Sequence, residues 1–121
     1  MNDQTTLGEL KLAVRRFNEE RDWGRYHSPR NLAMALSVEA AELLELFLWS
    51  EDAGPQPPVA SRTERVPEEL ADVLILVANL ADRLDIDLGG AFAAKLVRNG
   101  EKYPAERVAG RLEKYDEYPE P

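Results

Sequence analysis

The chain has 121 residues, with 15 Lys or Arg against 23 Asp or Glu, one His and no Cys, so its formal net charge is −8. This length suits one domain that buries a core without disulfides or a structural metal. The absence of cysteine excludes thiol nucleophiles and zinc sites built on thiolates. The acidic balance argues against nucleic acid and anionic membranes as partners, because both bind basic surfaces. A secretory signal would show a basic stretch followed by an apolar one, and we see no such pattern. We therefore expect a cytoplasmic protein.

Four helices are predicted in chain order, and their pattern favours an all-α, antiparallel bundle of four to five helices. They are expected from the capping box at Thr6 to about Arg21, from Pro29 to about Trp49, from the turn after Pro67 to about Leu84, and from near Asp87 to Lys102. We expect them to form one domain over residues 1–112, followed by an acidic, flexible tail over residues 113–121.

The third predicted helix contains a stretch, Leu70 to Ala78, in which the only polar side chain is that of Asp72. A helix that is apolar on nearly all sides has to be covered on more than one side. Because four helices from one small chain can hardly cover it, we expect it to lie in a homo-oligomer interface. The alternative is a central core helix of a monomer.

Four acidic side chains lie inside apolar helical segments, as two pairs with the same spacing. Glu39 and Glu42 form the first pair, and Glu69 and Asp72 form the second. A spacing of three residues places both members of a pair on one helix face. Carboxylates in apolar surroundings need basic partners, raised pKa values or bound cations. Since no base stands three or four residues from Glu39 or Asp72, a cation is favoured.

The donor set indicates which cation. Carboxylate oxygens are preferred ligands of Mg²⁺ and Mn²⁺, and Ca²⁺ is also compatible with them. A ferritin-like di-iron site would need Glu-x-x-His on two helices, whereas the one histidine, His27, lies outside the carboxylate-bearing helices. The alternative is that the four carboxylates are ordinary solvated faces of amphipathic helices, but the apolar runs that border both pairs favour a site.

The order Glu39-x-x-Glu42, 26 residues, Glu69-x-x-Asp72 resembles the motif of the MazG-like all-α nucleoside triphosphate pyrophosphohydrolases. Further segments are similar to the dCTP pyrophosphatase branch of this family: residues 21–27 (RDWGRYH), 29–32 (PRNL), 47–49 (FLW) and 95–104 (KLVRNGEKYP). The resemblance covers roughly residues 7 to 104. It implies the MazG-like fold and Mg²⁺-dependent hydrolysis of a (deoxy)nucleoside triphosphate, with dCTP or a modified dCTP as the leading substrate, to the monophosphate and pyrophosphate.

The resemblance also implies roles for the acidic residues. It gives the metal to four carboxylates: Glu39, Glu42, Glu69 and Asp72. These would hold Mg²⁺ against the triphosphate, where it would activate a water for attack at the α-phosphorus. The catalytic candidates are Glu39, Glu42 and Glu45, and the choice of general base between Glu42 and Glu45 stays open.

Substrate contacts are implied at two further places. A stripe near the end of the fourth predicted helix could bind phosphate oxygens: Lys95, Asn99, Lys102 and Tyr103. Trp23 and Trp49 could stack on the nucleobase, and His27 could hydrogen-bond its edge or the sugar. The alternatives are a solvated cationic helix end, core packing for the tryptophans and a solvent-exposed histidine.

Two positions differ from the relatives that these motifs resemble, which carry Tyr at Leu76 and an acid at Val97. These differences leave the base preference open, so a different or broader dNTP range is possible. The alternative function is a non-catalytic, oligomeric helical module with a degenerate metal site. All four motif carboxylates are present, which favours the enzyme. The apolar coat of the third predicted helix predicts a stable dimer, or the tetramer that the resemblance to this branch implies.

Overall fold

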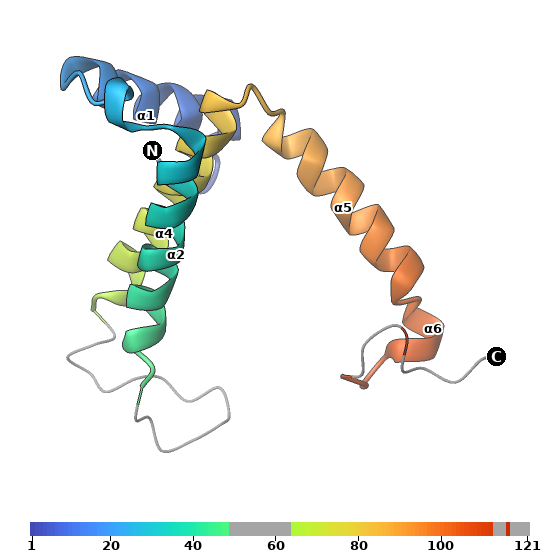
Figure 1. The fold of residues 1–121 in the computed structure, drawn as a ribbon. Helices are drawn as coiled ribbons and strands as arrows, with labels where there is room; N and C mark the ends of the chain where they lie inside the picture. Colours follow the sequence, from blue (N-terminus) through green and yellow to red (C-terminus); the bar gives the residue numbers. More distant parts are fainter. Residues whose placement is uncertain (49–63, 113–115, 117–121) are drawn as a thin grey trace. The chain divides into compact units, whose positions relative to one another are not determined.

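The structure is a computed structural model, and it describes residues 1–48, 64–112 and 116. Within these ranges it contains helices and no strand, which confirms the predicted all-α class. The elements are α1 (Leu7–Glu20), the 3₁₀ helix η1 (Gly24–Tyr26), α2 (Pro29–Glu45), α4 (Val66–Arg83), α5 (Leu88–Lys102) and α6 (Ala105–Val108). The α-helices are labelled in Figure 1.

The helix starts follow the local signals in the sequence. Thr6 caps α1 in a full capping box, because its Oγ1 accepts from the Glu9 backbone N at 3.2 Å and the Glu9 carboxylate accepts from the Thr6 backbone N at 2.7 Å. Ser28 caps α2 by accepting from the Asn31 backbone N at 3.1 Å. Asp87 caps α5 in the same way. These caps satisfy N–H groups that have no partner inside the helix.

The end of α2 differs from the prediction. The helix ends at Glu45, whereas the apolar pattern extends to about Trp49, which lies outside the described residues. The Phe47 backbone N donates to the Leu44 carbonyl at 2.9 Å, and the Leu48 backbone N donates to that of Glu45 at 3.3 Å. These bonds span three residues instead of four, so the chain leaves α2 through a tighter turn.

The chain divides into two compact units, residues 1–86 and residues 87–121. In the first unit, α2 and α4 lie side by side and run in opposite directions, and α1 packs against α4 (Figure 1). Arg15 of α1 forms an ion pair with Asp82 of α4, with 3.1 Å between Arg15 Nε and Asp82 Oδ2. The second unit contains α5 and α6. A single domain over residues 1–112 stays a prediction.

The apolar stretch of α4 is covered only in part within the first unit, where Ala78 is buried and several larger side chains are not. Leu70, Leu74 and Ile75 are 52%, 44% and 47% exposed. The structure therefore leaves several large apolar side chains of this helix open to a partner.

No helix among the described residues is long and apolar enough to cross a membrane.

Candidate active site

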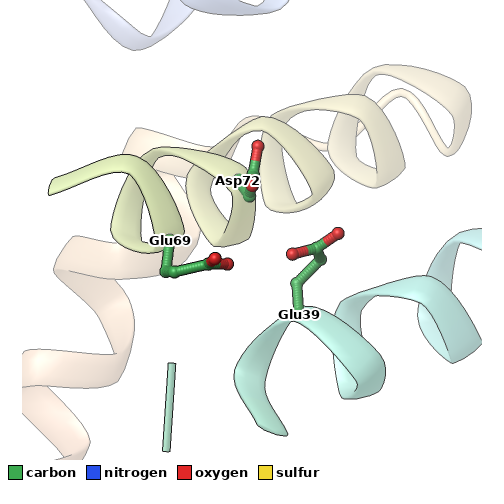
Figure 2. Close-up of side chains that lie close together, drawn as sticks. All are labelled: Glu39, Glu69 and Asp72. Carbon is green, nitrogen blue, oxygen red and sulfur yellow. The ribbon is translucent and has the colours of Figure 1, made fainter. Parts of the chain in front are cut away.

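The antiparallel packing of α2 and α4 brings acidic side chains from both helices together. Glu39 projects from α2 toward Glu69 and Asp72 of α4 (Figure 2). One carboxylate oxygen from each of the three lies within 4.8 Å of the others. Glu69 and Asp72 share a face because they stand three residues apart on one helix. The site is thus formed by two helices that are far apart in the sequence.

Two oxygens of this cluster are buried without compensation. Glu69 is 6% exposed, and its Oε1 accepts from Arg65 Nη2 at 3.0 Å. Glu69 Oε2 and Glu39 Oε2 are buried and have no hydrogen-bond partner among the described residues. A buried polar atom without a partner costs free energy, and a charged one costs more. A bound cation would compensate both oxygens.

The second pair member on α2 acts directly on Glu39. A hydrogen bond with Glu42 raises the pKa of Glu39 to about 7. Burial and the negative charges of Glu42, Asp72 and Glu69 shift this pKa in the same direction. Glu42 is half-buried beside the cluster, whereas Glu45 is exposed at the end of α2. The negative charges of the cluster therefore disfavour the ionised form of Glu39.

The donors suit a hard divalent cation. All of them are carboxylate oxygens, and no histidine belongs to the three-residue cluster in the described part of the chain. Oxygen-only sites favour Mg²⁺, Mn²⁺ or Ca²⁺ over zinc or copper. With such an ion, the cluster can hold phosphate groups and polarise a water molecule.

A largely apolar cavity of about 430 Å³ lies beside the same helix. Its wall includes Val14 and Phe17 of α1, Leu76 of α4, and Trp23 and His27 of the turn between α1 and α2. The rings of Phe17 and Trp23 meet edge to face with centroids 5.7 Å apart, and those of Trp23 and His27 are 6.3 Å apart. Two of the predicted base-binding residues, Trp23 and His27, thus line one cavity.

The remaining predicted substrate contacts are not joined to this site by the structure. Lys95, Asn99 and Lys102 are exposed residues of α5, and Tyr103 caps its end. They belong to the second unit, which is described by itself. Trp49 lies outside the described residues. The phosphate-binding role of α5 and the stacking role of Trp49 stay predictions.

Three residues of the site were missed in the sequence. Arg65, which pairs with Glu69, stands four residues before it, so the helical spacing could have indicated it. Asn79 is 5% exposed, and its Nδ2 lies 3.2 Å from His27 Nδ1. Arg83 donates from Nε to the His27 carbonyl at 2.9 Å and from Nη2 to the Gly24 carbonyl. No local pattern indicates Arg83, because its partners lie in a distant turn.

Comparisons with known proteins give independent evidence on the family of the chain. The model of the MazG-like family matches residues 34–117. The chain is 42% identical to dCTP pyrophosphatase 1 of Homo sapiens and 41% identical to that of Rattus norvegicus, over 96% of this chain and 69% of each relative. A solved pyrophosphatase structure from Archaeoglobus fulgidus matches with a TM-score of 0.71 and 37% identity, over 86% of this chain and 97% of that chain.

These matches test the resemblance drawn from the carboxylate motif. They confirm the predicted fold class and the predicted kind of enzyme, a nucleoside triphosphate pyrophosphohydrolase similar to the dCTP diphosphatases. The matched region includes all four motif carboxylates and the whole of α4. The chain belongs to the MazG-like family.

Proposed function

We propose that the protein hydrolyses dCTP, or a modified dCTP, to the monophosphate and pyrophosphate with Mg²⁺ as its cofactor; Mn²⁺ is a second candidate. The observation that carries the proposal is the cluster of Glu39, Glu69 and Asp72, with two buried carboxylate oxygens that lack partners. The curated relatives are named dCTP pyrophosphatase 1, which supports dCTP as the substrate. Mg²⁺ suits both the oxygen donors and a triphosphate.

The reaction joins a water oxygen to the α-phosphorus and breaks the bond from that phosphorus to the oxygen that bridges it to the β-phosphorus. Pyrophosphate leaves with the bridging oxygen, and the water gives up a proton. Glu39, Glu69 and Asp72 would hold the cation, with Glu42 beside them. The bound Mg²⁺ would supply charge neutralisation at the phosphates and lower the pKa of the attacking water. Glu42 or Glu45 accepts the proton of the water.

In the proposed complex, the phosphates of the substrate lie at the carboxylate cluster. Its base enters the apolar cavity, where Trp23 presents a ring and His27 presents a polar group. Lys95, Asn99 and Lys102 contact the phosphates, together with Tyr103. Trp49 also contacts the base. Such phosphoryl chemistry depends mainly on positioning and charge neutralisation, and both would come from these groups.

The test is pyrophosphate release from dCTP, dTTP, dATP and dGTP with Mg²⁺, by wild type and by Glu69→Gln and Asp72→Asn. We expect each variant to lower kcat/KM for dCTP by more than about a hundredfold, since even outer-shell partners of a metal are worth 10–100-fold. Glu68→Gln is the matched control, because this substitution removes the same charge from an exposed position on α4. It should retain wild-type activity.

Asp72→Asn separates loss of function from loss of fold. Asp72 is exposed and its charge disfavours ionised Glu39, so its substitution should not lower the melting temperature of the metal-free protein while it removes activity. Wild type that releases no pyrophosphate from any of the four nucleotides with Mg²⁺ or Mn²⁺ would contradict the proposal. Equal activity of wild type, Asp72→Asn and Glu68→Gln would also contradict it.

The exposed apolar face of α4 supports a homo-oligomer, a dimer or a tetramer. Leu70 and Leu74 stand one turn apart on α4, and both are about half exposed. Exposed apolar side chains that gather on one face indicate a contact surface. We propose that a second copy of the chain covers this face.

A further inference from the structure

Asn79 occupies a place in the site that neither the motif nor the comparisons assign. It lines the apolar cavity and is 5% exposed. On α4, it stands seven residues after Asp72, and Leu76 lies between them. Residues at these spacings share one helix stripe, and seven residues span about 10 Å of helix axis. One stripe of α4 thus carries a cluster carboxylate, an apolar wall residue and a buried amide.

The stripe runs from the carboxylate of Asp72 to Asn79, which lines the cavity and contacts His27. A nucleotide has the same order of groups, with phosphates at one end, an apolar base face in the middle and a polar base edge at the other end. The apolar faces of Phe17, Trp23 and Leu76 suit the base ring. Among the cavity residues on α4, Asn79 is the one with a hydrogen-bonding side chain.

The amide of Asn79 is held in one orientation. An amide nitrogen only donates, so Asn79 Nδ2 donates to His27 Nδ1 across 3.2 Å in the imidazole tautomer whose Nδ1 accepts. Arg83 fixes the same turn by donating to the His27 carbonyl at 2.9 Å. His27 is the one hydrogen-bond partner of the Asn79 side chain among the described residues. The Asn79 Oδ1 and one N–H therefore remain for a ligand.

We propose that Asn79 reads the polar edge of the nucleobase, and that His27 is the positioning residue that fixes the direction of its amide. An acceptor beside a donor matches a base edge with a donor beside an acceptor, such as the amino group and ring nitrogen of cytosine. A mismatched base leaves the buried amide without hydrogen-bond partners, so the protein binds that base less tightly. This inference rests on the proposed function, because it takes the occupant of the cavity to be the base of the nucleotide substrate.

The experiment compares wild type with Asn79→Leu and Asn79→Asp on dCTP, dTTP and deoxyribose 5-triphosphate, which has no base. We expect both variants to lower kcat/KM for dCTP about tenfold or more, mainly through KM, as loss of a buried hydrogen bond implies. Hydrolysis of the base-free triphosphate should stay at the wild-type rate. The ratio of kcat/KM for dCTP to that for dTTP should fall.

The positioning role has its own readout. His27→Gln keeps an amide oxygen that can accept from Asn79, so it should retain more of the dCTP preference than His27→Ala. Equal losses on dCTP and on the base-free triphosphate in the Asn79 variants would show a structural role only and overturn the inference. An unchanged ratio of kcat/KM for dCTP to that for dTTP would overturn it as well. In both cases, hydrolysis of dCTP by the wild type would leave the proposed function standing. Wild type without activity on any nucleotide overturns both.

Should Asn79→Leu fail to fold, Asn79→Asp decides alone, because it preserves the shape of the side chain and keeps an oxygen that can accept from a ring N–H of His27. Its melting temperature is measured beside that of wild type. A folded Asn79→Asp with the wild-type dCTP to dTTP ratio overturns the inference, and a lowered ratio supports it.

Discussion

Glu39 has an unusual titration because of its neighbours. A hydrogen bond with Glu42, then burial, then the surrounding negative charges raise its pKa from 4.5 to about 7. Its Oε2 is also buried without a partner among the described residues. The carboxylate is therefore unstable as an anion while the site holds no cation, and proton and metal compete for it.

We expect the metal-free protein to lose stability as the pH rises from about 4.5 to about 7. In this window the folded protein keeps a proton on Glu39 that the unfolded chain has already released, so the free energy of unfolding falls with rising pH. Mg²⁺ should reverse the trend, because it binds the ionised carboxylates of the folded state. Urea unfolding in EDTA and in Mg²⁺ across this pH range measures both effects.

Glu39→Gln tests the assignment of this pH dependence, since it removes the titrating group and keeps the shape of the side chain. The fall of stability with pH in EDTA should become smaller in this variant. Glu45→Gln is the matched control on α2, because Glu45 is exposed, and it should keep the wild-type slope. An equal slope in all three proteins would show that other groups cause the pH dependence.

At the scale of the element, α4 combines several tasks. It carries Glu69 and Asp72 near its start, Leu76 in its middle and Asn79 one turn later. A rigid helix fixes the distances between such groups better than a loop does. The position of α4 in turn depends on α1 and α2, which pack against it. The caps that start α1 and α2 therefore support the site indirectly.

We expect Thr6→Ala and Ser28→Ala each to lower the free energy of unfolding by about 1 kcal/mol, because each removes an N-cap hydrogen bond. Urea denaturation measures the change. Ser37→Ala is the control: Ser37 Oγ donates back to the Ala33 carbonyl within α2, and such a bond adds little to helix stability. A loss in Ser37→Ala as large as in the cap variants would argue against the capping explanation.

At the scale of the whole molecule, the described chain buries few of its apolar side chains. The buried apolar residues are Leu32, Leu46, Ala78 and Ala81. Large apolar side chains on the outer faces of α2 and α4 are exposed, among them Val38 at 57% and Leu74 at 44%. Burial of such surface is the main favourable term in association. A partner copy is the proposed way in which this surface leaves water.

We expect light scattering to give a dimer or a tetramer for wild type, and a smaller species for Leu74→Glu. The substitution places a charge on the exposed apolar face of α4, where its desolvation would oppose association. Gln4→Glu adds the same charge at an exposed position before α1 and should leave the mass unchanged. A wild-type mass of 13.6 kDa at micromolar concentration would contradict the proposed oligomer.

Local signals predicted much of the molecule. The capping box at Thr6, the Ser28-Pro29 start and the Asp87 cap specify helix starts, because each depends on groups within a few residues. The end of α2 was predicted four residues too late, because an apolar run continues past Glu45 while the backbone bonds tighten. The last turn of a helix is often a tighter 3₁₀ turn, and the hydrophobic pattern does not indicate where this turn begins.

The sequence by itself determined the helical class, the family and the two acidic pairs, because helical spacing places residues three apart on one face. Only the tertiary structure decided that Glu39 meets Glu69 and Asp72 within 4.8 Å, and that two of their oxygens lack partners. It also decided that Asn79 binds His27, which lies 52 positions away in the chain. Contacts over such separations depend on how helix faces pack, and the spacing within a single helix does not contain that information.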